Sequence, residues 1–322
     1  SSNAEPAEMD ELRINEIVAA VLRELESQGL LPTTSVPTSP ASVPGTSAAI
    51  PVAKPPRMDV GQLNIDLPDP ALEAQRYLPR VHNPKDPAAL KELIACTPAR
   101  IGVGRSGPRY RTASLLLFQG DHAITQDALY RDVDQKLLTD YNLFSVQTAV
   151  TEGREQYLLR PDLGRQLSED AKKTLAQRCV RNPNVQLVVG DGLSASAIES
   201  NLRLIMPVLL QGFQSAGLTV GTPFFVKYCR VGVMNDIGDL LQPEVLILLI
   251  GERPGLGRAE SMSAYMGYKP HAGNNDADRD VICNIFEKGG TNPMEAGAFI
   301  VQFAQKMRQY QASGVKLKLA AK

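Results

Sequence analysis

The chain has 322 residues, of which 43% are hydrophobic and 21% are charged, and its formal net charge is −1. This length and balance predict a globular protein of two domains. The near-zero charge gives no basic field for nucleic acid or an anionic membrane, and no apolar run reaches the roughly 18 residues of a membrane-spanning helix.

The first 57 residues are predicted to precede the folded body. Residues 1–30 contain an amphipathic helix over residues 9–30, and residues 31–57 form a linker rich in Pro, Ser, Thr and Ala. The apolar face of the helix consists of Ile14, Ile17, Val18, Val21, Leu22 and Leu25. The helix either docks on a protein groove or self-associates, as a targeting or docking element, or it folds back onto the main body. Its mostly acidic polar face disfavours anionic lipid.

The rest of the chain is predicted to hold a helical domain and an α/β domain. Residues 58–135 read as helical, with Asp86 as an N-cap before Pro87 and a second apolar helix over residues 113–118. Residues 136–313 alternate between strands and helices, which predicts a Rossmann-like three-layer α/β domain with a largely parallel sheet. The strands are expected at residues 143–150, 185–189, 224–228 and 246–250, and the helices at residues 165–180, after residue 194 and at 293–310. Residues 314–322 are predicted to be a flexible tail.

The end of the strand over residues 245–250 is the first candidate site. An unbroken apolar run leads into Glu252 and Arg253, and Pro254, Gly255 and Gly257 shape the loop that follows. Ligands of open α/β sheets bind beyond the carboxyl ends of the strands. The two charged residues are therefore either ligand contacts or a salt-bridged pair in a tight turn.

Two glycine-containing segments resemble nucleotide or anion sites. Residues 102–107 spell the dinucleotide fingerprint, but no strand precedes them and Pro108 follows, so a turn between helices with exposed arginines fits better. Residues 188–194 lead from a strand through Gly190 and Gly192 to a helix that begins after Ser194. Either the free N–H groups of that helix bind an anion or polar ligand, or Ser194 caps an ordinary βα turn.

The residue types of metal and nucleophilic sites do not cluster in the sequence. His82, His122 and His271 lack Cys, Asp or Glu neighbours at ligand spacing, so no metal site is predicted. The scattered cysteines, Cys96, Cys179, Cys229 and Cys283, suit reduced thiols, and no secretory leader opens the sequence. We therefore expect a cytoplasmic chain that carries no catalytic residues of its own.

Several longer blocks resemble the small (light) subunit family of ethanolamine ammonia-lyase. The two longest are residues 217–226, GLTVGTPFFV, and residues 251–257, GERPGLG. Supporting blocks are residues 105–109, 159–165, 191–194 and 289–291. The resemblance covers roughly residues 80–315 and also suits the amphipathic character of the N-terminal helix.

The resemblance implies a lyase that uses adenosylcobalamin to convert ethanolamine into acetaldehyde and ammonia. A large subunit, built on a TIM barrel, would bind ethanolamine and carry most of the radical chemistry. The small subunit would contact the cofactor through residues at the matching positions Val231, Glu252 and Cys283. Glu252 would accept hydrogen bonds from the amides of the corrin rim, while Val231 and Cys283 would offer packing and backbone groups.

The resemblance also implies a location and a second partner. Enzymes of ethanolamine breakdown are commonly enclosed in a bacterial microcompartment, and residues 9–30 are similar to the helices that address cargo to a shell protein. Two other functions stay open: a stand-alone nucleotide-dependent enzyme using residues 102–107, and an assembly factor that stabilises a large partner. No nucleic-acid or membrane partner is expected.

Overall fold

The computed structural model describes residues 72–97, 99–256 and 258–321. By its internal contacts the chain divides between Ile65 and Asp66, and all the described residues belong to the second compact unit. The helical segment before residue 135 and the sheet after it therefore share one unit. The helix predicted at residues 9–30 and the linker predicted at residues 31–57 lie outside the described residues.

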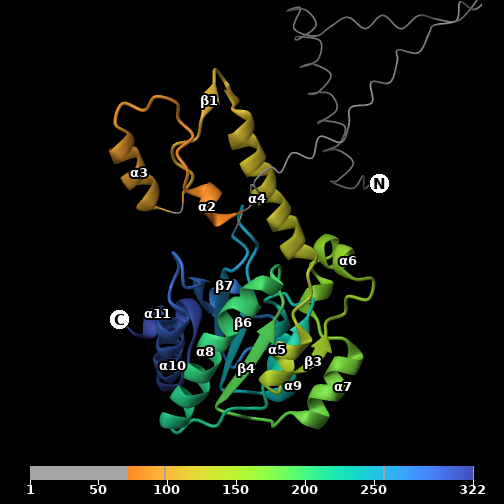
Figure 1. Ribbon diagram of the computed structural model, residues 1–322. Helices are drawn as coiled ribbons and strands as arrows, with labels where there is room; N and C mark the ends of the chain where they lie inside the picture. Colours follow the sequence, from red (N-terminus) through yellow and green to blue (C-terminus); the bar gives the residue numbers. More distant parts are fainter. Residues whose placement is uncertain (1–71, 98, 257, 322) are drawn as a thin grey trace, which may run out of the picture. The chain divides into compact units, whose positions relative to one another are not determined.

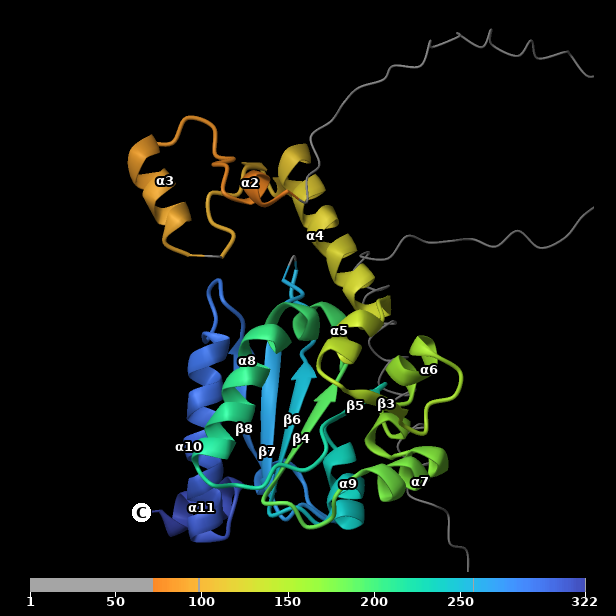
Figure 2. The ribbon, with the colours of Figure 1, turned by 60° about the horizontal axis from the view of Figure 1, so that its bottom comes forward.

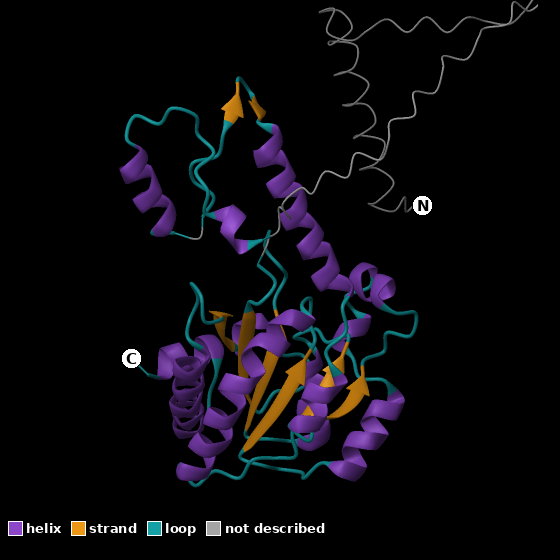
Figure 3. Ribbon diagram, in the orientation of Figure 1, coloured by secondary structure: helices purple, strands orange, loops and turns teal. Residues whose placement is uncertain are grey.

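A mixed sheet forms the centre of this unit (Figure 3). Its six strands lie in the order β3-β5-β4-β6-β7-β8. The first four strands in that order are parallel, and the last two extend the sheet in antiparallel fashion. The strands are β3 (Phe144–Gln147), β4 (Val185–Gly190), β5 (Phe224–Lys227), β6 (Val245–Gly251), β7 (Met262–Tyr268) and β8 (Asp280–Ile285).

Helices cover both faces of the sheet and make three layers (Figures 1 and 2). One face packs against α5 (Gln135–Asp140), α8 (Ala195–Ser215) and α10 (Pro293–Tyr310). The other packs against α7 (Glu169–Arg178) and α9 (Val233–Leu241). The strand order is not that of the dinucleotide-binding fold, so the α/β class is confirmed but the Rossmann-like detail is not.

The crossovers between the parallel strands reverse direction at β4. Strand β4 lies between β5 and β6 in the sheet. Helix α8 connects β4 to its neighbour β5, and α9 then connects β5 to β6, which is the neighbour of β4 on the other side. Connections that leave neighbouring strands toward opposite faces open a crevice beyond the strand ends. The topology therefore predicts a ligand site next to the carboxyl ends of β4, β5 and β6.

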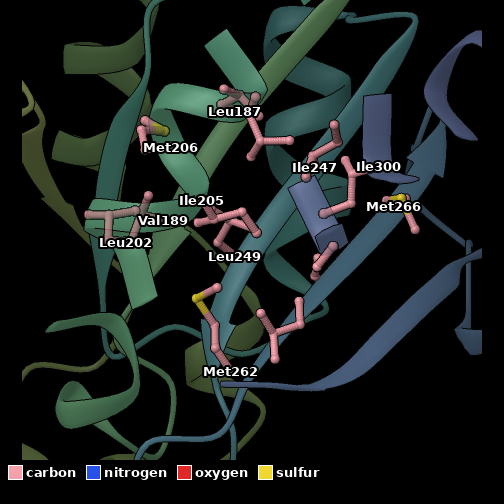
Figure 4. Close-up of a cluster of buried hydrophobic side chains, with 14 of the residues drawn as sticks. Leu187, Val189, Leu202, Ile205, Met206, Ile247, Leu249, Met262, Met266 and Ile300 are labelled. Carbon is pink, nitrogen blue, oxygen red and sulfur yellow. The ribbon is translucent and has the colours of Figure 1, made fainter. Parts of the chain in front are cut away.

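The largely apolar sequences of β4 and β6 are explained by burial on both faces, with Gln186 as a buried polar residue in β4. On one face, Leu187 and Ile247 pack with Ile205 of α8 and Ile300 of α10 (Figure 4). Alternate residues of the same strands, such as Leu248, pack against α7 and α9 on the other face. Each fully buried aliphatic side chain stabilises the fold by roughly 1.5–3 kcal/mol relative to an exposed one.

The helical segment comprises α2 (Glu73–Arg76), α3 (Pro87–Ala95), a short hairpin and α4 (Thr112–Tyr130). Asp86 caps α3 as predicted, since its carboxylate accepts the N–H groups of Ala88 and Ala89. Buried Asp121 of α4 is ion-paired with Arg76 and Arg100. Arg100 also donates to Leu256 O at 2.8 Å, so this cluster connects α4 to the loop that follows β6.

The sequence 102–107 does not form a nucleotide-binding turn. Arg105–Ser106 (β1) and Arg109–Tyr110 (β2) pair as a two-stranded hairpin, with Gly107 at its tip. Helix α4 begins only at Thr112, after the hairpin has closed. These glycines therefore do not present the backbone N–H groups of a helix end. The predicted exposure holds for Arg105 and Arg109, whereas Arg111, the third arginine of this segment, is half-buried.

The end of the chain differs from the predicted flexible tail. Residues Gly314–Ala320 form helix α11, and Leu317 is buried in the core beside α10. The N–H of Gly314 donates to Asp280 at 2.6 Å, which fixes the start of the helix to β8. The lysine content of this segment suggested a solvated tail, but the lysines occupy only the outer face. Within the described part of the chain, no helix is long and apolar enough to cross a membrane.

Candidate functional site at the carboxyl ends of the parallel strands

A pocket of about 320 Å³ lies where β4, β5 and β6 end, and we call it the strand-end pocket. Its walls come from the loops after those three strands, from α6 (Arg154–Leu159) and from β7. It is lined by Tyr157, Gly192, Leu193, Cys229, Arg230, Val231, Ile250, Gly251, Glu252, Arg253 and Tyr265. Two of the three predicted cofactor-contacting residues, Val231 and Glu252, therefore lie in one pocket.

The carboxylate of Glu252 is held by the neighbouring antiparallel strand. Ser261 Oγ donates to Oε2 at 2.7 Å, and Ser263 Oγ donates to Oε1. Among the described residues no ion pair joins Glu252 to Arg253, so the alternative of a salt-bridged turn is not supported. The N–H of Asn284 also donates to Oε1, at 3.5 Å. A carboxylate offers about four acceptor sites, so these three donors leave room for a further donor from a ligand.

Val231 and Arg230 form the wall contributed by the loop after β5. Val231 is half-buried and packs against the core beneath α9. The guanidinium of Arg230 lies 4.3 Å from the ring centre of Tyr157 and donates to Tyr157 O at 3.3 Å. Its Nε is buried without a hydrogen-bond partner among the described residues. Leaving such a donor unpaired costs free energy, but a nitrogen without accessible surface does not face the pocket, so any ligand contact of Arg230 would come from the rest of its side chain.

Cys283 lies on β8, beside the strand-end pocket rather than in its lining. Its side chain is exposed, and its thiol is close enough to Tyr265 to raise the pKa of that phenol, after the larger effect of burial and together with Glu252. Tyr265 therefore lies near all three predicted residues. It lines the pocket together with Val231 and Glu252, and it is close to Cys283 on the neighbouring strand. Local sequence patterns did not single out Tyr265, since β7 itself was not predicted.

The turn between β4 and α8 is an internally closed structure. Ser194 Oγ accepts the N–H of Ala197 and donates to Ala259 O, so the start of α8 is capped and covered. Gly192 has a φ of +56°, and a Cβ there would lie 2.2 Å from Gly251 O. Of the two alternatives, the capped βα turn is therefore favoured over an anion site, although Gly192 and Leu193 still line the pocket.

A second, more polar cleft of about 600 Å³ continues from the strand-end pocket. The two share Arg230, Val231 and Tyr265. Its remaining lining includes Asn235, Asn274 and Arg279, the last of which is 5% exposed and paired with Asp276. A broad ligand with both apolar faces and amide groups would fit this combination better than a small compact one.

Metal-binding groups do not gather here. In the part of the chain that the structure describes, no cluster of three or more His, Cys, Asp or Glu side chains could hold a metal ion. Fold and pocket together define an α/β protein with a candidate ligand site at the carboxyl ends of parallel strands.

Comparisons with known proteins identify the family. The family model described as ethanolamine ammonia-lyase light chain matches residues 87–318. Three relatives carry the name ethanolamine ammonia-lyase small subunit. The Clostridium perfringens protein is 47% identical over 238 residues, which are 74% of this chain and 80% of the relative.

The other two relatives agree. The Clostridioides difficile protein is 46% identical over the same shares of both chains, and the Fusobacterium nucleatum protein is 49% identical over 69% of this chain and 75% of its own length. The chain therefore belongs to the ethanolamine ammonia-lyase light chain family, as the resemblance predicted. Membership as a small subunit implies a large subunit as partner.

Proposed function

We propose that the chain is the small subunit of an adenosylcobalamin-dependent ethanolamine ammonia-lyase and that the strand-end pocket forms one wall of its cofactor site. The observation that carries the proposal is the convergence of Glu252, Val231 and Tyr265 in one pocket, with Cys283 on the adjacent strand. These residues come from separate parts of the chain. Val231 and Cys283 were chosen by resemblance to the family, to which the chain belongs, and the structure is what brings them close to Glu252.

The residues present suit a corrin, whose faces are apolar and whose rim carries amides. The carboxylate of Glu252 can accept amide N–H groups, and Arg230 and Arg253, which line the same pocket, carry guanidinium groups that can donate to amide oxygens. Val231 and Tyr265 supply apolar contact, and the adjoining cleft extends the surface. The fit rests on both donor and acceptor chemistry, as a rim of primary amides requires.

The chain's part in the reaction is to bind and orient the cofactor and to exclude water from one side of it. Adenosylcobalamin, when bound, supplies the radical chemistry that converts ethanolamine into acetaldehyde and ammonia. Ethanolamine recognition belongs to the large subunit, a TIM barrel, and no catalytic residue is assigned to this chain. Residues 1–30 would direct the complex to the shell protein of an ethanolamine-utilisation microcompartment in the bacterial cytoplasm.

The test compares this chain, its large subunit and the co-purified complex. Each is titrated with adenosylcobalamin and followed by visible absorbance, and ethanolamine is then added while acetaldehyde is measured. We expect tight adenosylcobalamin binding and acetaldehyde release only from the complex and not from either subunit by itself. A complex that releases acetaldehyde with cofactor affinity unchanged by Glu252→Gln would instead favour an assembly role for this chain.

A further inference from the structure

Asp191, the residue directly after β4, is a buried carboxylate that the site described above does not use. It is 1% exposed and lies at the boundary between β4 and the turn to α8. Burial raises its pKa, whereas Arg154 and the backbone N–H groups of Tyr228 and Cys229 act in the opposite direction. A buried carboxylate is costly unless it is paired and hydrogen-bonded, so its partners indicate what it does.

Both oxygens of Asp191 bind the loop after β5. Oδ2 accepts the N–H of Tyr228 at 3.0 Å, and Oδ1 accepts the N–H of Cys229 at 2.9 Å. Tyr228 has a φ of +57°, in the left-handed region that a side chain disfavours by roughly 1–2 kcal/mol. Without these two acceptors, the amides would be left unpaired in a strained turn. Val231 follows only three residues beyond Tyr228, on the wall of the pocket.

Arg154 of α6 is a further partner of the Asp191 carboxylate. Its guanidinium donates to Asp191 Oδ2 at 3.1 Å and to Gly192 O at 3.1 Å, and its side chain is 8% exposed. It also lies 5.2 Å from the ring centre of Tyr157 and 5.1 Å from that of Tyr228. One cation therefore joins the turns after β4 and β5, which are adjacent walls of the pocket.

A third contact holds the same loop from α6. The phenol of Tyr157 is fully buried and donates to Cys229 O at 2.8 Å. The backbone of Cys229 is thus bound at its N–H by Asp191 and at its carbonyl by Tyr157. Contacts of this kind fix the backbone from which Arg230 and Val231 project.

From this geometry we infer that Asp191 is a positioning residue for the cofactor pocket. It acts through the backbone of residues 228–231, since it is 1% exposed and does not itself line the pocket. The inference rests on the proposed function, because the wall that Asp191 fixes is the wall assigned to adenosylcobalamin. A preorganised wall binds its ligand more tightly because the loop is not ordered at the moment of binding.

The test uses the complete complex with its large subunit and the variant Asp191→Asn, which keeps the shape but loses the charge and one of the acceptors. We expect the KM for adenosylcobalamin to rise about ten-fold or more, as for loss of a buried charged hydrogen bond. The kcat at saturating cofactor and the KM for ethanolamine should stay at their wild-type values. This split separates positioning of the cofactor from a general loss of structure.

The matched control is Asp132→Asn. Asp132 is the other carboxylate near Arg154, at 3.5 Å, but it is largely exposed and accepts no N–H from the loop after β5. We expect this variant to have the wild-type KM for adenosylcobalamin. A second variant, Tyr157→Phe, removes only the bond to Cys229 O and should raise that KM a few-fold, as for a neutral hydrogen bond.

An unchanged KM for adenosylcobalamin in Asp191→Asn would overturn the inference. So would a fall in kcat together with a rise in both KM values, which marks a purely structural role. If that variant does not assemble, Tyr157→Phe decides the matter, and its wild-type behaviour would reject the inference. Failure of the wild-type complex to be saturated by adenosylcobalamin would instead reject the proposed function.

Discussion

At the scale of single residues, the orientation of Glu252 is set mainly by two hydroxyl groups, with a longer bond from the N–H of Asn284 at 3.5 Å. Ser261 and Ser263 each donate to one carboxylate oxygen, and Ser263 is 1% exposed. Hydroxyl donors can rotate, so a neutral amide in place of the carboxylate would still find partners here. Replacing the Glu252 carboxylate by an amide therefore tests how strongly this side chain accepts hydrogen bonds more than it tests where the side chain lies.

Glu252→Gln is expected to weaken adenosylcobalamin binding to the complex by roughly 1–3 kcal/mol, because a charge-assisted acceptor is lost. The measurement is a titration followed by visible absorbance. Glu244→Gln is the control, since Glu244 precedes the opposite end of β6, where it pairs with Arg308. Equal affinity in the two variants would contradict a direct role for Glu252.

Gly192 is a residue at which shape alone restricts the sequence. Its φ is +56°, and an added Cβ would meet Gly251 O, which is backbone and is also bonded to the N–H of Leu193. The turns after β4 and β6 can approach each other only without a side chain at this position. The close approach forms the floor of the strand-end pocket.

Gly192→Ala is expected to lower the free energy of unfolding by about 2–5 kcal/mol, the sum of a left-handed conformation and an overpacked contact. Gly217→Ala is the matched control, because Gly217 has a φ of +68° but open space around an added Cβ. It should lose only about 1–2 kcal/mol. Denaturant unfolding of the two variants gives the comparison, and equal losses would show that the contact with Gly251 is unimportant.

At the scale of elements, helix α11 contributes to the core despite its lysine-rich sequence. Leu317 is 2% exposed and belongs to the same cluster as α8 and α10, while Leu319 of the same helix is 65% exposed. A seven-residue helix is not stable alone, so its packing and its bond to Asp280 must hold it.

Leu317→Ala is therefore expected to cost about 2–5 kcal/mol of stability, the range for a buried leucine. Leu319→Ala should change stability by no more than about 0.5 kcal/mol, as for an ordinary surface substitution. The midpoints of denaturant unfolding decide between them. Similar small values for both would indicate that residues 314–320 do not pack against the core in solution.

Elements fixed by local sequence signals were predicted correctly, whereas elements that depend on contacts between distant parts of the chain were missed. The bounds of α10 agree with those predicted, because Pro293 and the apolar period are local signals. Strand β7 was missed, since Ser263 and Gly267 interrupt its apolar pattern and its stability comes from pairing with β6. Its omission also hid the antiparallel part of the sheet and Tyr265.

The candidate site shows the same division. Glu252 was found because it ends an apolar run, and Val231 and Cys283 came from family resemblance. The pairing of Asp191 with Arg154 spans 37 residues and could not be read from either local sequence. Asp191 itself was noticed only as part of a glycine-containing turn, because nothing local indicates that its carboxylate binds another strand's loop.

At the scale of the whole molecule, the N-terminal residues are predicted to act separately from the body. The segment 1–57 combines an amphipathic helix with a linker, and the family model begins only at residue 87. Deletion of residues 1–57 is expected to leave the activity of the complex unchanged and to abolish its co-localisation with shell protein. Activity assays and fluorescence microscopy provide the two readouts. Unchanged packaging would reject the targeting role, and lost activity would assign the segment to the catalytic body.

The antiparallel extension of the sheet has a further consequence for assembly. On the α9 side, β8 presents Val281, which is 44% exposed, and Cys283, so the wall built from β7 and β8 stays open on that side. The binding site of a ligand held against such a wall is completed by the partner that covers the wall. Thermodynamic linkage then requires reciprocity: any factor by which the large subunit tightens cofactor binding is the factor by which cofactor tightens the association of the two subunits. Under the proposed function, this open face of β7 and β8 would make the cofactor a component of the subunit contact, and adding cofactor would then tighten the association of the two subunits.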